Sequence, residues 1–398
     1  MTAPLEGIRV VDWTHVLAGP ACAYYLGLLG AEVIKVERPG KGDAMRHRGG
    51  TDKARAAGGM STAYLTQSAG KQALAVDLAQ DAGREIFARL LSTADVLVEN
   101  HRPETLQRLG VTEAETRAIN PRLIHCAMTG YGRHNDMSGA PAYDVNIQAI
   151  SGLMALTGTP ETGPLRTGAP IVDYATAMTA AMAVMAALLQ RAQTGLGAFV
   201  DVSMLETAFA LMSSTITDYQ LTGKAPTPRG NAANSRSPSS GVFACADGHI
   251  SLGVNEEAQF QALARALQQD HWLTDPRFAT AGARETHGRA LGAALEQVLQ
   301  TRPAADWEHQ LMAAGVPCAR LRSLPEALDM PAARQRGFAH RGAAGFCGVP
   351  FHLDGVQAGA ANAHPRQRGA DSHNILERLG FSADDIATFE AEGIVQGA

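Results

Sequence analysis

Short apolar runs alternate with amphipathic stretches through the first third of the chain. Runs of four or five β-branched and apolar residues are typical of strands, and the stretches between them carry apolar residues at helical spacing. The pattern predicts strands at 8–11, 33–36, 73–76, 95–98 and 123–127, and helices at 21–29 and 81–91. Alternation of strand and helix predicts βαβ units, which build a parallel sheet.

The pattern changes in the second half of the chain. A long alanine- and methionine-rich helix is predicted from Asp173 to about Arg191, then a strand at 199–202 and a helix at 204–219. Residues 222–241 are rich in Gly, Pro, Ser and Asn, which indicates a linker or a functional loop. A hairpin signal at Asp247-Gly248 and later helical patterns predict a small α+β domain over 242–321. Residues 322–338 read as a second linker, and 339–398 as a loop-rich tail with two short helices.

Composition narrows the class of protein. Of 398 residues, 45% are hydrophobic and 18% charged, as in compact folded proteins. The net charge of -5, with 34 basic residues spread along the chain, lacks the concentrated basic face of nucleic-acid binders. Five scattered cysteines fit a reducing compartment. The start of the chain lacks a signal-peptide pattern, and the apolar run 177–189 is shorter than a membrane span of about 20 residues. We therefore expect a cytoplasmic protein that binds neither membranes nor nucleic acid.

One carboxylate stands out. Asp173 lies at the mouth of the long helix, where an aspartate is either a helix cap or a nucleophile. Ala18-Gly19-Pro20 follows the first strand in place of a G-x-G-x-x-G loop, which disfavours a nicotinamide or flavin cofactor. The residues alone leave both roles of Asp173 open.

A series of motifs in a fixed order extends over nearly the whole chain. They are Gly7-Ile8-Arg9-Val10-Val11-Asp12, His15-Val16-Leu17-Ala18-Gly19-Pro20, Leu29-Gly30-Ala31-Glu32-Val33-Ile34-Lys35-Val36-Glu37-Arg38-Pro39, Asp95-Val96-Leu97-Val98-Glu99-Asn100, Gly130-Tyr131-Gly132 and Arg166-x-Gly168-x-x-x-x-Asp173. Together they resemble the family III CoA transferases, which include formyl-CoA and carnitine CoA transferases. The resemblance implies an α/β fold: a Rossmann-like large domain over 1–221, completed by about 339–398, with the small domain inserted and two subunits interlocked as a homodimer.

The resemblance also implies a mechanism. Asp173, ionised at neutral pH given its ordinary pKa near 3.9, would attack an acyl-CoA thioester to form an aspartyl anhydride and then an aspartyl-CoA thioester. Coenzyme A and acyl-CoA are then substrates, and neither a metal nor a tightly bound cofactor is expected. Asparagine caps as well as aspartate but cannot act as this nucleophile, so Asp173→Asn separates the two roles.

Residues that would hold CoA are implied by likeness to the family: His15, Val16, Arg38, Val76, Asp77, Asn100, His101, Arg102, Arg108, Tyr143 and Asp144. Related α-methylacyl-CoA racemases carry a histidine at the Tyr143 position, and tyrosine is a poor base at pH 7. This favours a transferase. A racemase or isomerase, a formyl- or oxalyl-type transferase and a catalytically silent CoA-binding protein are the alternatives.

Departures from the family concern the acyl group. Leu17 replaces the glutamine of formyl-CoA transferases, and a glycine-rich loop is replaced by a segment with Arg229, Asn231 and Arg236. These arginines, or Arg46, would clamp the distal carboxylate of a dicarboxylic acyl group, because arginine binds carboxylates in a bidentate way. We expect a donor such as succinyl-CoA or another dicarboxylyl-CoA, and a small carboxylic acid as acceptor.

Overall fold

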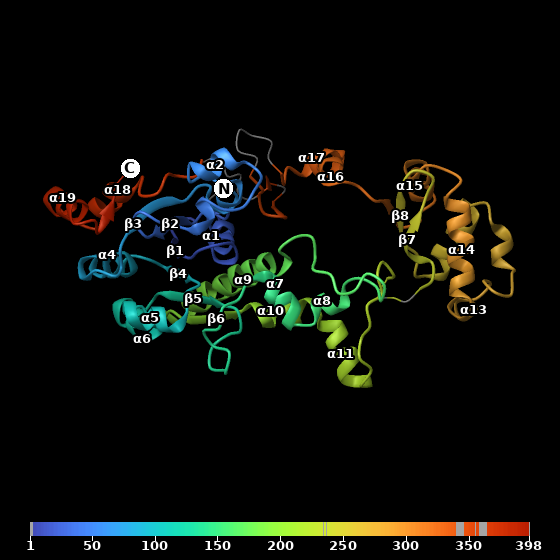
Figure 1. Ribbon diagram of the computed structural model, residues 1–398, viewed down its shortest axis with the longest axis horizontal. Coiled ribbons are helices and arrows are strands. Elements are labelled where there is room, and N and C mark those ends of the chain that lie inside the picture. Colours follow the sequence, from blue (N-terminus) through green and yellow to red (C-terminus); the bar gives the residue numbers. More distant parts are fainter. Residues whose placement is uncertain are drawn as a thin grey trace. The chain divides into compact units, whose positions relative to one another are not determined.

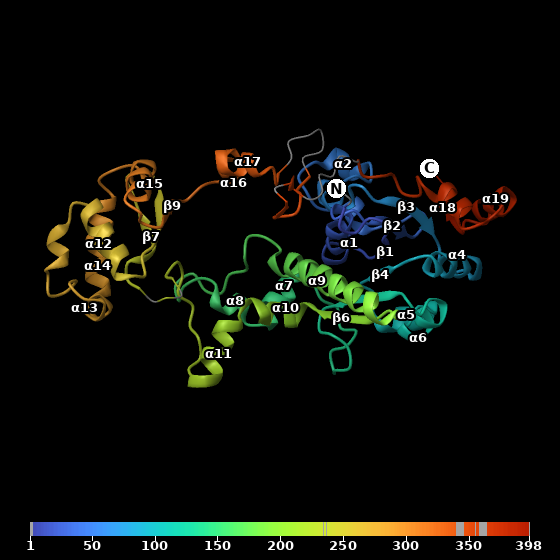
Figure 2. The same cartoon turned by 180° about the vertical axis from the view of Figure 1, so that it is seen from behind.

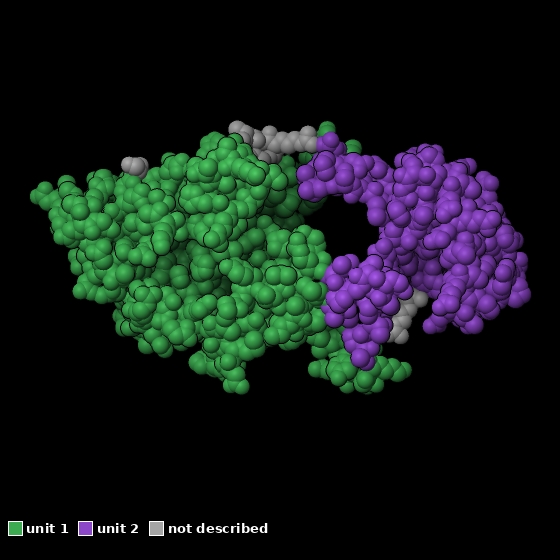
Figure 3. Space-filling view, viewed as in Figure 1, with its two compact units in different colours: residues 1–154, 166–224, 331–398 green, residues 155–165, 225–330 purple. Residues whose placement is uncertain are grey.

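The computed structural model describes residues 3–233, 235, 237–339, 346–354, 356–357 and 364–397. The chain forms two compact units, coloured separately in Figure 3. The first unit consists of Met1–Met154, Arg166–Lys224 and Pro331–Ala398, and the second of Ala155–Leu165 and Ala225–Met330. The large unit is thus built from both ends of the chain. Residues 155–165, which the sequence places in the large domain, belong to the second unit.

A seven-stranded sheet forms the centre of the first unit (Figure 1). Its strand order is β12-β3-β2-β1-β4-β5-β6, with β12 antiparallel to β3 and all other pairs parallel. The strands are β1 (Arg9–Trp13), β2 (Glu32–Glu37), β3 (Gln72–Val76), β4 (Val96–Glu99), β5 (Ile124–Thr129), β6 (Phe199–Ser203) and β12 (Val395–Gln396). The six parallel strands confirm the predicted α/β class. The short strand β12 was not predicted, because two residues carry no periodic signal.

Side chains alternate between the two faces of the sheet, and each face is covered by helices. Val10 packs with α1 (Ala18–Leu28) and α9 (Ile171–Thr194), whereas Val11 packs on the opposite face. The helices of that opposite face are α4 (Asp81–Ser92), α5 (Pro103–Leu109), α6 (Glu113–Ile119), α18 (Ser372–Arg378) and α19 (Ala383–Ala391). A parallel sheet buried on both sides requires this arrangement, because apolar side chains of its strands point to both faces.

Helix α9 is the long helix that the sequence predicts, and Gly195 ends it in a left-handed conformation. Its small residues Ala177, Ala180 and Val184 are fully buried against the sheet and α1. The opposite side exposes Met178 (50%) and Met182 (62%). By length and composition alone α9 also meets the criterion for a membrane span, a test that buried core helices pass as well.

Smaller elements of the first unit surround this core. They are η1 (Ala44–Arg46), α2 (Lys53–Ala57), α3 (Thr62–Ser68), α7 (Asp144–Ile150), α10 (Met204–Leu211), α11 (Ser213–Thr222), α17 (Pro331–Arg336) and the pair β10 (His352–Leu353) and β11 (Val356–Gln357). The short helix α8 (Leu153–Leu156) leads into the second unit. The sequence predicts one helix over 204–219, but Met212 departs from helical geometry and separates α10 from α11.

The second unit is a small α+β domain. Strands β7 (Ser240–Ala244), β8 (His249–Gly253) and β9 (Cys318–Arg320) form an antiparallel sheet in that order. Its helices are α12 (Glu257–Ala266), η2 (Asp270–Leu273), α13 (Ala281–Thr286), α14 (Gly288–Leu299), α15 (Ala304–Ala313) and α16 (Leu324–Asp329). Trp272, Trp307 and Phe260 fill its own core. Figure 2 shows these elements from behind.

Strand order fixes where a ligand site forms in the first unit. The chain builds outward from β1 through β2 to β3, and then outward on the other side from β4 through β5 to β6. Ligands of open α/β sheets bind beyond the carboxyl ends of the strands at such a reversal. The loops that follow β1 and β4 therefore mark the expected site.

Candidate active site

A cavity of about 390 Å³ opens at this reversal point. Its walls come from the loops after β1, β4 and β5, from the approach to α7 and from the first turn of α9. Residues predicted from the sequence that line it are His15, Val16, Leu17, Asn100, His101, Arg102, Tyr143 and Asp173. Residues from positions 15 to 173 of the chain are thus gathered around one cavity.

Asp173 is not the cap of helix α9. The helix begins at Ile171, so Asp173 is its third residue, in the first turn, and the N-cap residue Pro170 makes no side-chain cap bond. Asp144 takes the capping role: its Oδ2 accepts hydrogen bonds from the backbone N–H of Val172 (2.8 Å) and Asp173 (3.2 Å). No hydrogen bond from any described residue reaches the Asp173 carboxylate. The capping interpretation of Asp173 is therefore wrong, and its side chain is left for the cavity.

Asp144 was expected to contact CoA, and the structure corrects this. Its side chain is 7% exposed, and its Oδ1 accepts a hydrogen bond from Nε2 of Gln148 at 2.6 Å. Gln148 in turn accepts from the backbone N–H of Thr167. Asp144 thus ties α7 to the start of α9 and has no surface to offer a ligand. Its neighbour Tyr143 is 61% exposed and lines the cavity.

Burial, and after it the charge of the nearby Asp144 carboxylate, together raise the pKa of Asp173 to about 7. The expectation of full ionisation at neutral pH was wrong, because it used the ordinary pKa of an exposed aspartate. At pH 7 the free protein holds Asp173 in comparable amounts of both forms. A carboxylate that is partly shielded from water and accepts no hydrogen bonds is a stronger base than an exposed one.

His101 and Asn100 follow β4 and form the wall next to the β1 loop. The His101 ring stacks on Trp13 with centroids 4.0 Å apart, and burial lowers its pKa to about 3, so the ring is neutral at pH 7. The backbone N–H of His101 donates to buried Glu99 (2.7 Å). The Asn100 side chain bonds the backbone of His15. This wall presents neutral groups and backbone to the cavity.

Besides Asp144, four residues predicted to bind CoA lie outside the lining of the cavity. Arg38 and Asp77 directly follow β2 and β3 and form an ion pair of 3.6 Å at the same carboxyl edge of the sheet. Val76 is fully buried in β3, and the N–H of Asp77 is bonded to the carbonyl of Ile394. Arg108 is exposed on α5. Their contacts with CoA stay predictions.

The assignment of Arg46 to the substrate is wrong. Its side chain is 1% exposed, and its guanidinium holds Glu37 in a bidentate ion pair, with nitrogen–oxygen distances of 2.8 and 2.6 Å. It also donates to Tyr64 and lies over the ring of that residue. An arginine so occupied has no donors for an acyl carboxylate.

Among the other predicted substrate residues, Arg229 and Asn231 belong to the second unit, and Arg236 lies outside the described residues. Roles of these three residues stay predictions.

Several lining residues were missed by sequence reasoning. Met128 and Thr129 end β5, Gly130 directly follows it, and Met204 begins α10; all four line the cavity. The position of β5 beside β4 was the available signal, because residues at the carboxyl ends of neighbouring parallel strands share one edge.

Comparisons with known proteins agree with this geometry. A sequence profile of the CoA-transferase family III matches residues 5–372. The chain is 36% identical to acetyl-CoA:oxalate CoA-transferase of Acetobacter aceti, over 82% of this chain and 83% of that one. It is 33% identical to human succinyl-CoA:glutarate CoA-transferase (84% and 75%) and 32% identical to succinyl-CoA–D-citramalate CoA-transferase of Chloroflexus aurantiacus (98% of both).

Comparison with solved structures shows the same fold in a related protein. A CAIB/BAIF family protein from Brucella suis superposes with a TM-score of 0.84 at 28% identity, over 95% of this chain and all of that one. The profile and the relatives support transfer of CoA between a thioester and a carboxylic acid. The chain belongs to the CoA-transferase family III.

Proposed function

We propose that Asp173 is the nucleophile of CoA transfer. A carboxylate oxygen of Asp173 attacks the carbonyl carbon of the donor thioester, the carbon–sulfur bond breaks, and CoA thiolate leaves an aspartyl anhydride. The thiolate then attacks the aspartyl carbonyl, which releases the donor acid and leaves an aspartyl-CoA thioester. The acceptor carboxylate attacks this thioester, and the returning thiolate attacks the acceptor acyl carbon to regenerate Asp173.

This proposal rests on one observation: no described residue donates a hydrogen bond to the Asp173 carboxylate. A structural aspartate at a helix start spends its oxygens on backbone N–H groups, but at this helix Asp144 does so. Asp173 instead faces the cavity, desolvated and with a raised pKa. The positive end of the helix dipole favours the negative charge that its oxygens carry.

Succinyl-CoA or a related dicarboxylyl-CoA is the donor that we propose, with a small carboxylic acid as acceptor. Two relatives named for succinyl-CoA support this, and Leu17 gives the cavity an apolar wall beside Asp173. Arg229 is our candidate for the distal carboxylate. No tightly bound cofactor takes part in this mechanism, because CoA itself carries the thiol.

The setting of the reaction is also a proposal. We propose a cytoplasmic homodimer that acts without membrane or nucleic acid. The exposed Met178, Met182 and Leu189 on α9 support the homodimer, since such a row of apolar side chains on one helix is typical of a covered face.

Succinyl-CoA and butyryl-CoA are a matched pair for the donor test, because they differ in a terminal carboxylate against a methyl group. We expect kcat/KM to favour succinyl-CoA in the wild type, and Arg229→Gln to lower that preference about tenfold or more. Arg265→Gln, an exposed arginine of α12, is the control. Equal use of both donors by the wild type would refute the dicarboxylyl assignment and leave the transferase intact.

The racemase alternative is tested in the same preparation. In heavy water without any acceptor acid, a racemase exchanges the α-hydrogen of 2-methylacyl-CoA, whereas a transferase leaves it in place. We expect no exchange, because Tyr143 replaces the histidine base.

A further inference from the structure

The loop between β1 and α1, residues 14–17, carries the one left-handed β-branched residue of the described chain. Val16 has a φ of 70°, and the other described non-glycine residues with positive φ are His134, Gln268 and Asp354. A β-branched residue adopts this conformation only where its surroundings force it. Val16 also lines the Asp173 cavity, so the forced conformation shapes the site.

Three side chains hold consecutive peptide groups of this loop. Lys35 Nζ donates to the carbonyl of Thr14 at 3.0 Å. Asn100 bonds both sides of the next residue: its Oδ1 accepts from the His15 N–H (2.9 Å) and its Nδ2 donates to the His15 carbonyl (2.8 Å). Asp43 Oδ1 accepts from the Val16 N–H at 3.3 Å. These bonds from Lys35, Asn100 and Asp43 converge on the turn at Val16.

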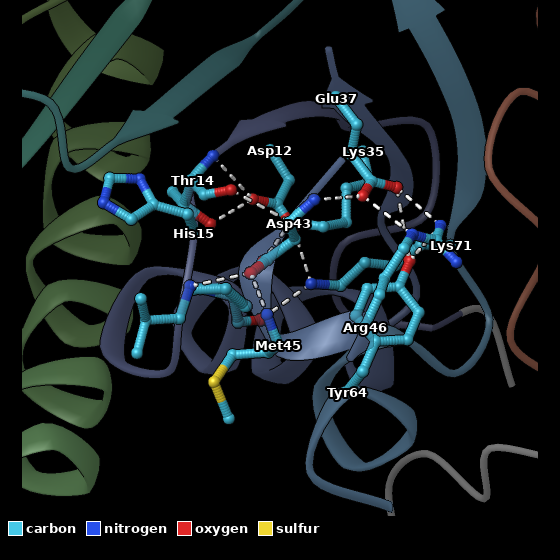
Figure 4. A network of polar contacts seen from close by, with 12 residues as sticks. Asp12, Thr14, His15, Lys35, Glu37, Asp43, Met45, Arg46, Tyr64 and Lys71 are labelled. Atoms are coloured by element: carbon cyan, nitrogen blue, oxygen red, sulfur yellow. Dashed lines mark hydrogen bonds and ion pairs between the residues drawn. The ribbon is translucent and has the colours of Figure 1, made fainter. Parts of the chain in front are cut away.

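Two of the side chains that hold the loop, Lys35 and Asp43, are themselves fixed by a buried ionic network (Figure 4). Lys35 lies 3.4 Å from Asp43 and 3.9 Å from Asp12, and Lys71 bonds Asp12 at 2.6 Å. The N–H of Asp43 donates to Glu37, the partner of Arg46. Three cations face three anions, all nearly inaccessible to water. Buried ion pairs of this kind often add little to the free energy of unfolding. Their attested use is to select a single conformation of the chain around them.

The first turn of α1 closes the loop from the other side. A Cβ on Gly19 would lie 2.6 Å from two carbons of Thr14, so the helix packs directly on the loop. Neither the network nor Asn100 takes part in the proposed bond changes at Asp173. Both the network and Asn100 act on the position of the backbone at residues 14–17.

We propose that Lys35, Asp43 and Asn100 are positioning residues, which hold the β1–α1 loop in its left-handed turn and so fix one wall of the cavity for acyl-CoA. This rests on the proposed function only in naming CoA as the occupant. It also gives Asn100 a different role from the direct CoA contact that the family resemblance implies.

Asn100 could support CoA binding by holding the loop or by direct contact with CoA. Relief of the backbone strain at Val16 separates these two roles. Calorimetric titration with free CoA is made on the wild type, Asn100→Ala, Val16→Gly, Val16→Ala and the two double variants. Asn100→Ala should weaken CoA binding about tenfold, since a left-handed non-glycine residue is disfavoured by about that factor. Val16→Gly should remove most of this loss in the double variant, because glycine adopts the turn without cost. Val16→Ala removes the two methyl groups but keeps the Cβ that disfavours the left-handed turn, so it should restore much less of the binding.

The outcomes are distinct. A loss at Asn100→Ala that persists unchanged in the Val16→Gly background would overturn the proposal in favour of direct contact. Should Asn100→Ala fail to fold, thermal unfolding of the Val16 variants decides, since a held left-handed turn makes Val16→Gly more stable than Val16→Ala, and the reverse order would overturn it. A wild type that neither binds CoA nor transfers it would refute the proposed function instead, before any variant is compared.

Discussion

Replacement of Asp173 by asparagine has an effect on stability that depends on pH. A pKa of about 7 against the ordinary 3.8 means that the folded protein keeps the proton that the unfolded chain loses. Below pH 3.8 both states are protonated and the group makes no difference. As pH rises from about 4 to 7 the wild type loses stability, and above 7 the loss is constant. Asparagine does not titrate, so the variant escapes this loss.

The size of the effect follows from the same numbers. At 1.36 kcal/mol per pKa unit, the raised pKa corresponds to an upper limit of about 4 kcal/mol. Asp173 faces a solvent-accessible cavity, and water there reduces the cost to about 1–3 kcal/mol. Asparagine forfeits no cap bond, because Asp144 supplies the cap. We therefore expect Asp173→Asn to be more stable than the wild type by about 1–3 kcal/mol at pH 8, and nearly equal at pH 4.

Urea unfolding of both proteins at pH 4, 6 and 8, fitted with a common m value, measures the difference. Asp136→Asn, which makes the same change at an exposed carboxylate, is the control for the substitution itself. A stability difference between Asp173→Asn and the wild type that stays constant from pH 4 to 8 would show that Asp173 is not desolvated, and the reasoning from its burial would be refuted.

Three further predictions concern the site and its supports. The kcat/KM for transfer should rise with pH through about 7 as Asp173 ionises, and Asp144→Asn should move this rise to lower pH; a flat profile between pH 5.5 and 8 would contradict the role of the ionised form. Gly19→Ala should lower the midpoint of thermal unfolding by several degrees because its Cβ meets Thr14, whereas Gly292→Ala in α14, with open space around it, should leave it equal or higher; equal effects of the two variants would show that the helix does not press on the loop. Arg46→Met should destabilise the protein by about 3–5 kcal/mol in urea unfolding, because it leaves the buried Glu37 carboxylate without its ion-pair partner. The ratio of succinyl-CoA to butyryl-CoA turnover should not change. A changed ratio would restore Arg46 as a substrate residue.

Much of the fold was predictable because it depends on local patterns. Apolar runs at Val10 and Val33 and the amphipathic stretch at 81–91 each satisfy a strand or helix on their own, and their alternation fixes a parallel sheet. The strand β12 was not predictable, because its partner β3 lies far away in the chain. The assignment of residues 155–165 to the second unit likewise depends on tertiary contacts.

The candidate site divides in the same way. Asp173 was found from its position at a helix start together with the family motifs, and the structure places it on the cavity. Its true cap, Asp144, comes from another helix, and its raised pKa depends on that neighbour and on burial. Arg46 was misassigned because the sequence gives no sign that Glu37 faces it across a fold of the chain. Charge type is readable from the sequence, but pairing and burial are properties of the folded chain.

Transfer of heavy oxygen tests the central claim most directly. The acceptor acid, labelled with ¹⁸O in its carboxylate, is turned over with acyl-CoA, and trypsin then releases residues 167–191, a peptide whose one side-chain carboxylate is Asp173. If Asp173 forms the anhydride, each turnover leaves one acceptor oxygen on it, so mass spectrometry should find this peptide with one and then two heavy oxygens. An unlabelled peptide from protein that has turned over many times would contradict the account.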